Sequence, residues 1–292
     1  MAERRMTLAL FGAFDFRVDG SPVNLGLSGP TRSMLQYLVC CTGRLTRREQ
    51  LMEMFWSGTS PERRRSSLNS AIWRIKKALR TADAPAAFAI DATAECVRMA
   101  GTRSPEVDID AVSLADAFAA ASAPGAGEAD VERLLATLNG CDGTPLDGLD
   151  DDWAQVERER LEAFRLRGFS IAMRLLAQRR RYDEALDFGH RILLHDPFHE
   201  CAVQEVLCIH ALNGQRVRAL KLFDAFSESL ASELGISPMP ETRALRDFLA
   251  GNGTPALAET QGEPGGQVLV HPGVDELLSS IAQSRGAVRL HS

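Results

Sequence analysis

The chain has 292 residues, of which 45% are hydrophobic and 25% are charged, so it is long enough for about two ordinary globular domains. Its six cysteines show neither a C-x-x-C pair nor the dense spacing of a disulfide scaffold, and no apolar run approaches the ~20 residues of a membrane span. These features exclude a disulfide-rich secreted domain and a membrane-spanning protein, and we expect a reduced, cytoplasmic protein.

The net charge of −6 is distributed unevenly along the chain. Residues 1–80 contain 14 Lys or Arg against 6 Asp or Glu, a net charge of +8, whereas residues 81–292 carry a net charge of −14. A basic head on an acidic body concentrates the attraction to phosphate in one domain. The distribution therefore favours a nucleic-acid partner for the first part of the chain.

The first elements are a small sheet and two helices. Residues 7–19 alternate apolar and polar side chains, and Asp19-Gly20 then marks a hairpin turn, so a short antiparallel sheet is predicted. Apolar residues at helical spacing predict a helix from Pro30 to Cys41. A second helix is expected after Thr46, because Glu49 stands three residues later, as in a capping box.

The third helix, Pro61–Arg80, is the most informative stretch. Its apolar residues recur at offsets of four, seven and eleven and form one narrow stripe: Leu68, Ile72, Ile75 and Leu79. The opposite face carries Arg63, Ser66, Ser70, Trp73, Arg74 and Lys77. Seven Lys or Arg residues against one Glu give this helix a charge of +6. The pattern fits a recognition helix that enters the major groove of DNA, and the competing interpretation is a solvated surface helix.

The candidate DNA-binding residues divide by their position on this helix. Arg63 and Lys77 lie near opposite ends of the outer face and are assigned to phosphates. Four residues nearer the middle are the candidates for base edges: Ser66, Asn69, Ser70 and Arg74. Arg65 and Trp73 complete the predicted contact surface on the helix.

Two short strands, at residues 88–90 and 96–99, follow the third helix and are joined by a tight polar turn. Strands, three helices and a strand-turn-strand wing are the order of winged-helix proteins that begin with a sheet. The segments LTRREQLMEMFW and RRSSLNSAIWRIKKAL resemble the DNA-binding domain of the antibiotic-regulatory (SARP) type of bacterial activator. The resemblance implies that the buried stripe is the core of the recognition helix and that Arg98 is a wing contact.

The remainder of the chain is mostly helical in pattern. Residues 100–111 are interpreted as the linker and the start of a second domain, and long amphipathic segments follow. Ala185 and Leu186 recur as Ala219 and Leu220 at an offset of 34, and Ala177 matches Ala211. This period and these small residues are typical of tetratricopeptide helix pairs.

The order of the two parts extends the resemblance to residues 7–250, since residues 146–161 and 234–243 are similar to the bacterial transcriptional activation domain of the same family. We therefore predict a mainly α protein: a winged-helix DNA-binding domain at residues 1–103, a tetratricopeptide-like activation domain at 104–250, and a flexible linker and tail at 251–292. The resemblance implies that the partners are promoter DNA and RNA polymerase, and that the loop at residues 56–60 faces the polymerase. It also implies a homodimer and a location at the nucleoid.

Other chemistries have weaker support. His190, His195 and His199 lie near Asp196 and Cys201, but their spacing across a helix end favours ordinary histidines over a metal site. Cys40-Cys41 fits a buried thiol pair better than a redox sensor, and residues 150–152 fit a solvated acidic turn. No catalytic pair or cofactor fingerprint is present, so neither an enzyme nor a cofactor is predicted.

Two functions remain open on the sequence. In the first, the winged helix binds a promoter and the helical domain dimerises or contacts partners to activate transcription. In the second, the chain is a tetratricopeptide-type interaction adaptor whose basic winged domain reads little sequence. The uneven charge and the polar outer face of the third helix favour the first.

Overall fold

A computed structural model describes residues 4–41 and 43–251 of the chain. The predicted tail at residues 251–292 thus lies, apart from Gly251, outside the described residues. The chain divides into two units, Met1–Arg165 and Leu166–Ser292, which are described in turn. This division differs from the predicted domain boundary at residue 103, which stays a prediction.

The first unit begins with a four-stranded sheet in the order β4-β3-β1-β8. Its strands are β1 (Met6–Ala9), β3 (Asp15–Val18), β4 (Ser21–Pro22) and β8 (Val107–Ile109). The predicted hairpin is confirmed: β3 pairs antiparallel with β4, and Asp19 and Gly20 have φ values of 50° and 78°, as a two-residue turn of this kind requires.

Residues 100–111, predicted to be the linker and the start of a second domain, contain a strand that the sequence did not indicate. Val107–Ile109 forms β8, which pairs parallel with β1. Val107 and Ile109 are buried, so the apolar side of this segment completes the first sheet instead of running through solvent. The alternation of Val107 and Ile109 is too short to have indicated a strand by itself.

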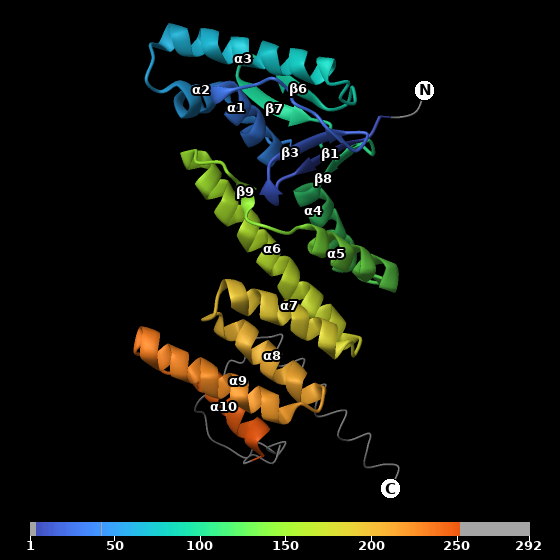
Figure 1. Ribbon diagram of the computed structural model, residues 1–292, viewed down its shortest axis with the longest axis vertical. Coiled ribbons are helices and arrows are strands. Elements are labelled where there is room, and N and C mark those ends of the chain that lie inside the picture. Colours follow the sequence, from blue (N-terminus) through green and yellow to red (C-terminus); the bar gives the residue numbers. More distant parts are fainter. Residues whose placement is uncertain (1–3, 42, 252–292) are drawn as a thin grey trace, which may run out of the picture. The chain divides into compact units, whose positions relative to one another are not determined.

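Three helices and a wing follow, as predicted (Figure 1). The helices are α1 (Gly29–Cys40), α2 (Arg48–Trp56) and α3 (Pro61–Thr81). The wing is the antiparallel pair of β6 (Ala89–Ala92) and β7 (Cys96–Ala100), and β5 (Thr46–Arg47) pairs with the other edge of β7.

The predicted capping box of the second helix is wrong. Thr46 is buried and pairs with Val97 in the sheet, and the residue that precedes the helix is Arg47, which makes no side-chain capping bond. Strand pairing with a segment much later in the chain outweighs the local signal from Thr46 and Glu49.

The core of the winged helix lies between the helices and the wing. Met34, Leu68, Ile75 and Met99 are fully buried. Cys40 and Cys41 are each only 1% exposed, which confirms the prediction of buried thiols at this pair. Burial raises the pKa of both thiols, so both are held in the neutral form at neutral pH.

Two further helices and the first part of a long helix complete this unit. They are α4 (Asp110–Ala121), α5 (Glu128–Gly140) and the N-terminal half of α6 (Asp152–Gln178), and the short strands β2 (Gly12–Ala13) and β9 (Pro145–Asp147) pair parallel between them. The indole N–H of Trp153 donates to Ser33 Oγ of α1 at 2.8 Å. Asp150, Asp151 and Asp152 are exposed, as predicted, but they lead directly into α6.

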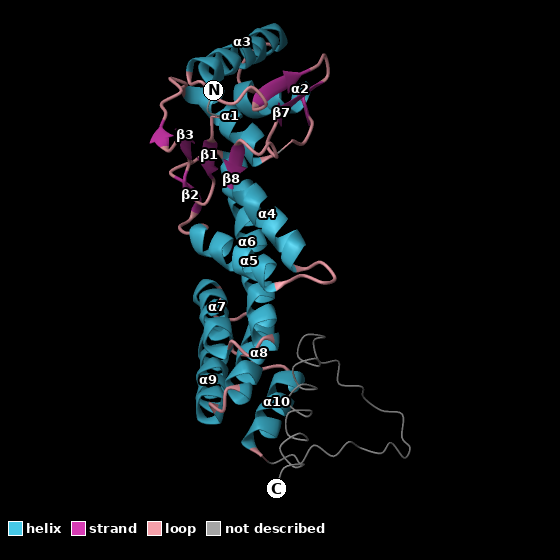
Figure 2. Cartoon of the chain, turned by 90° about the vertical axis from the view of Figure 1, so that its right-hand side faces the viewer, coloured by secondary structure: helices cyan, strands magenta, loops and turns pink. Residues whose placement is uncertain are grey.

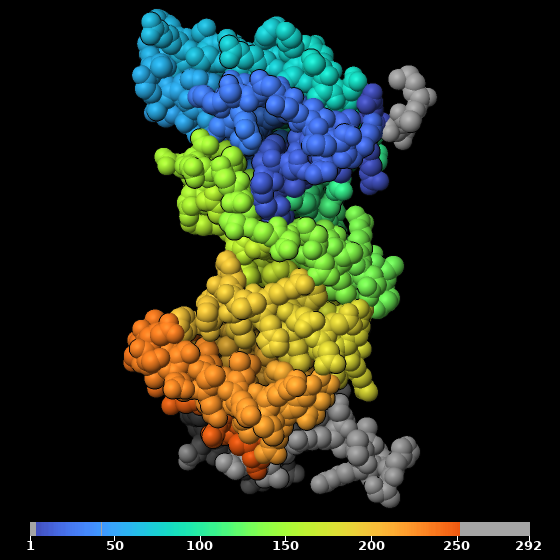
Figure 3. All heavy atoms as spheres, in the orientation of Figure 1, coloured from blue at the N-terminus to red at the C-terminus, as the bar shows by residue number. Residues whose placement is uncertain are grey.

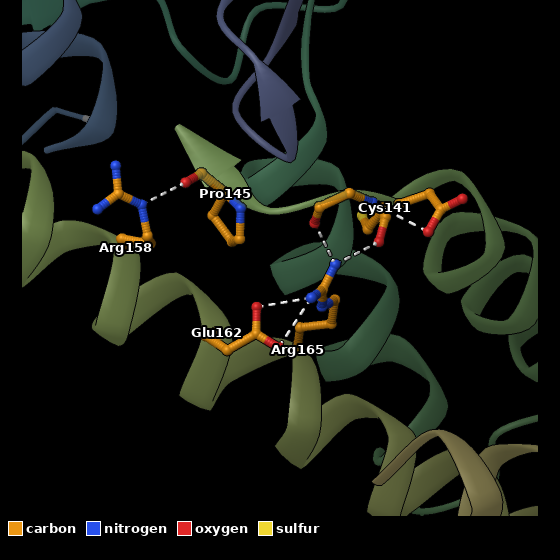
Figure 4. Close-up of polar contacts among 7 residues, drawn as sticks. Cys141, Pro145, Arg158, Glu162 and Arg165 are labelled. Atoms are coloured by element: carbon orange, nitrogen blue, oxygen red, sulfur yellow. Dashed lines mark hydrogen bonds and ion pairs between the residues drawn. The ribbon is translucent and has the colours of Figure 1, made fainter. Parts of the chain in front are cut away.

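Arginines of α6 hold the segment at residues 141–149 (Figure 4). Arg158 donates to the carbonyls of Pro145 and Leu149 at 3.0 and 2.8 Å. Arg165 donates to the carbonyl of Cys141 at 3.1 Å and pairs with Glu162 at 2.6 Å. These contacts give hydrogen-bond partners to backbone carbonyls in β9 and on either side of it.

The second unit is helical (Figure 2). After the end of α6 come α7 (Tyr182–His195), α8 (Glu200–Leu212), α9 (Arg216–Ser229), a π-helical turn η1 (Leu230–Leu234) and α10 (Pro240–Ala250). The two copies of the predicted 34-residue repeat occupy equivalent positions in two helices. Ala185 and Ala219 lie in the first turns of α7 and α9, and both are fully buried. The small side chains allow neighbouring helices to approach closely.

The histidines considered for a metal site have other places in this unit. His199 precedes α8, and its Nδ1 accepts a hydrogen bond from the backbone N–H of Ala202 at 3.2 Å. His190 lies against the ring of His210, with ring centroids 6.2 Å apart. Among the described residues no helix has the length and apolarity to cross a membrane.

Candidate nucleic-acid interface

The helix α3 is built to bury one side only. Ser60 precedes it, and its Oγ accepts from the backbone N–H of Arg63 at 3.4 Å, while Pro61 occupies the first turn, where its missing N–H costs nothing. The stripe predicted from the sequence is the buried face: Leu68 and Ile75 are 0% exposed, and Leu79 and Ile72 are 4% and 8% exposed.

The opposite side of α3 is open to solvent. All eight predicted contact residues on this helix are exposed: Arg63, Arg65, Ser66, Asn69, Ser70, Trp73, Arg74 and Lys77. The same segment lies along the surface of its unit in the space-filling view (Figure 3). We call these eight residues the outer face of α3. Its polar and basic side chains are of the kinds that contact phosphates and base edges in a major groove.

The arginines of the outer face carry unneutralised charge. Within the described part of the chain, the side chains of Arg63, Arg65 and Arg74 form no ion pair and no hydrogen bond. By contrast, Arg165 and Arg174 are paired with Glu162 and Glu205. The positive potential of the outer face is therefore available to an anionic partner.

One arginine of α3 has a structural role instead. Arg64 is half-buried, and its Nε donates to the carbonyl of Thr59 at 2.9 Å, while its other nitrogens bond the carbonyl of Ser57 and the carboxylate of Glu53. Arg64 thus holds the loop between α2 and α3 and is not part of the outer face. Gly58, within this loop, has no atom within 4 Å of the position that a Cβ would occupy.

The sequence did not indicate the role of Arg48, whose hydrogen bonds connect three elements of the candidate interface. Its Nη2 donates to Asn69 Oδ1 on α3, and its Nη1 donates to the carbonyl of Thr93 in the turn between the wing strands at 3.3 Å. Its backbone N–H also donates to the carbonyl of Glu95 at 2.8 Å. Arg48 therefore links α2, α3 and the wing, and it orients Asn69.

The predicted wing contact, Arg98, lies on β7 and is half-exposed. It forms an ion pair with Asp91 of β6 at 3.0 Å. The two side chains are 43% and 49% exposed, so solvent screens the pair and its contribution to stability is small. A phosphate near the wing would compete with Asp91 for this guanidinium.

Comparison with known proteins shows which proteins this chain is similar to. Residues 107–249 match the family described as bacterial transcriptional activator domain. The transcriptional regulatory protein EmbR of Mycobacterium tuberculosis is 26% identical over 255 residues, which are 84% of this chain and 63% of that protein. The regulatory protein AfsR of Streptomyces coelicolor is 26% identical over 258 residues, 85% of this chain and 25% of that protein.

A solved structure has the same fold. Mycobacterium tuberculosis EmbR in complex with a low-affinity phosphopeptide superposes with a TM-score of 0.71 at 20% sequence identity, over 98% of this chain and 72% of that chain. Residues 107–249 thus resemble a bacterial transcriptional activator domain, and most of the chain is similar to two regulatory proteins. The chain is similar to regulators of the antibiotic-regulatory (SARP) type, and it spans less than two thirds of the length of EmbR. The names of these relatives describe regulatory proteins.

Proposed function

We propose that the chain binds double-stranded promoter DNA, with the outer face of α3 in the major groove and Arg98 at the adjacent backbone or minor groove. It then activates transcription by contacting RNA polymerase through the loop at residues 56–60, and its helical domain dimerises or binds partners. Such binding places the protein at the nucleoid.

The observation that carries this proposal is the contrast between the two sides of α3. Its apolar stripe is buried, whereas Arg63, Arg65 and Arg74 are exposed without a partner in the described part of the chain. A surface helix that serves only solubility normally mixes both signs of charge. On α3 the only acidic residue is Glu62, in the first turn, where it favours the helix dipole.

The competing adaptor function predicts weaker discrimination between DNA sequences. The side chains on the middle of the outer face are short or planar hydrogen-bonding groups, Ser66, Asn69, Ser70 and Arg74, which suit base edges. The bond from Arg48 to Asn69 also fixes one of them, which favours sequence reading because an oriented amide loses less entropy on binding.

Two alanine variants test the division of labour on the outer face. Lys77→Ala should weaken specific and non-specific binding alike and reduce the slope of log affinity against log salt by about one unit, because it removes one phosphate contact. Arg74→Ala should cost on the order of 1–3 kcal/mol on the preferred site and relax the preference at one base pair.

The measurement is the dissociation constant of the full chain over a salt series, on a duplex from its own upstream region and on a scrambled duplex. Arg243→Ala is the matched control, because Arg243 is exposed on α10 and its loss changes the net charge equally. If the wild-type protein binds both duplexes equally, the adaptor function stands instead. Equal losses from Arg74→Ala on both duplexes would make Arg74 a backbone contact.

A further inference from the structure

Trp73 is the largest apolar side chain on the outer face of α3. It is 58% exposed, although tryptophan is a residue that proteins mostly bury. Its neighbours on the face, one turn away in each direction, are Asn69, Ser70 and Lys77. An exposed indole in the middle of a basic and polar face needs an explanation that solubility does not provide.

The ring has one cationic neighbour and one unused polar group. Lys77 Nζ lies over the ring of Trp73, 5.3 Å from its centroid, so the lysine is held close to the helix and covers one face of the indole. The indole N–H has no hydrogen-bond partner among the described residues. Trp73 therefore offers a free donor beside an open apolar edge.

That combination matches one base edge better than the others. In the major groove, thymine presents its O4 acceptor next to the 5-methyl group, whereas guanine presents acceptors without a methyl group and cytosine presents a donor. Adenine also presents an acceptor, N7, but a donor stands beside it. A donor next to an apolar surface is complementary to thymine alone.

We propose that Trp73 is a specificity-determining residue of α3 that recognises thymine, with its ring edge against the 5-methyl group and its N–H donating to O4 of the same base. This inference rests on the proposed function, since it requires α3 to lie in the major groove. Lys77, held over the other side of the ring, reaches a phosphate and carries no part of the thymine preference.

The test uses the full chain and three forms of one duplex. A preferred site is first enriched from random-sequence duplex DNA with the wild-type protein. The site is then synthesised with thymine, with deoxyuridine, which lacks the methyl group, and with 5-methylcytosine opposite guanine, which keeps the methyl group but replaces the acceptor by a donor. Dissociation constants are measured for wild type, Trp73→Ala, Trp73→Phe and Lys77→Ala.

For the wild type, deoxyuridine at the contacted position should weaken binding about fourfold, the change expected for exposing one methyl-sized apolar group. Trp73→Ala should bind the thymine and deoxyuridine forms equally. Trp73→Phe should keep the effect of the methyl group but discriminate less between thymine and 5-methylcytosine, because it lacks the N–H. Lys77→Ala should keep both preferences. Equal thermal unfolding of the four proteins excludes loss of fold, since the side chain of Trp73 is exposed.

The outcomes separate this inference from the proposed function. If the wild type enriches no site, then the proposed function and the inference both fail. If a site is enriched but the wild type is indifferent to deoxyuridine, or Trp73→Ala shows the same ratio as the wild type, then α3 binds DNA without reading thymine through Trp73 and only the inference fails.

Discussion

Gly189 on α7 marks the tightest approach between helices of the second unit. A Cβ at this position would lie 2.5 Å from Val206 Cγ2 on α8 and 3.0 Å from Met173 Sδ on α6. Gly189 has no positive φ and lies inside a regular helix, so its conformation suits any residue. Steric space alone therefore demands glycine here, and Gly189→Ala tests this packing.

Two opposing contributions decide the effect of Gly189→Ala. Replacing glycine by alanine inside a helix stabilises by about 1 kcal/mol. Overpacking a filled core costs about 1–3 kcal/mol. Met173 is flexible and its sulfur can shift, but Val206 is β-branched and fully buried, so it cannot turn away. We expect the cost to prevail and the variant to lose about 1–2 kcal/mol of stability.

The assay is urea unfolding followed by far-ultraviolet circular dichroism, because the second unit is helical and the three tryptophans lie outside it. Gly140→Ala on α5 is the matched control: no atom lies within 4 Å of the position that its Cβ would occupy, so this change should be neutral or stabilising. Adding Val206→Ala to Gly189→Ala should cost less than Val206→Ala costs the wild type. Unchanged or increased stability of Gly189→Ala would refute the close approach of α7 to α8.

Three further predictions concern the first unit and the cysteines. Gly58→Asp should lower activated transcription in a reporter assay and leave the dissociation constant for DNA unchanged. The reason is that the loop between α2 and α3 has room for a side chain and lies off the outer face. An equal loss of transcription and of DNA affinity would count against a polymerase contact. Gly101→Ala should prevent stable folding of the wing, measured as soluble yield and thermal unfolding, because φ is +72° and a Cβ would lie 2.0 Å from the carbonyl oxygen of Ala87. Cys141 and Cys208 should resist a thiol reagent between pH 7 and 9 until denaturant is added. Burial raises the pKa of each thiol to about 12, so the reactive thiolate is scarce below that pH. Rapid labelling of the folded protein would contradict this prediction.

The sequence was informative wherever a structure depends on local periodicity. The stripe of Leu68, Ile72, Ile75 and Leu79 is buried as predicted, because four apolar residues at helical spacing have one way to leave water together. The hairpin at Asp19-Gly20 also follows from local chemistry, since both residues tolerate positive φ. The 34-residue repeat likewise predicts that Ala185 and Ala219 occupy equivalent positions in two helices, as they do.

The missed features all depend on partners distant in the chain. Arg48 contacts Asn69 across 21 residues and Thr93 across 45, and nothing in the local sequence distinguishes it from neighbouring arginines. β8 forms only because β1, near the start of the chain, leaves an edge that Val107 and Ile109 complete. Thr46 was assigned to a helix cap for the same reason: the strand that pairs with it, β7, lies far along the chain.

The placement of charge on α3 shows why counting basic residues overstates the charge available on the proposed DNA-binding surface. The guanidinium of Arg64 is committed to the loop, and the pair with Asp91 partly neutralises Arg98, so neither has the freedom of Arg63 or Arg74. Non-specific attraction to DNA grows with each available cation, whereas discrimination depends on side chains held in one geometry. Because Arg48 fixes Asn69, the outer face of α3 combines free charge at some positions with orientation at others, and the proposed binding of a promoter requires both, to find a site and to distinguish it.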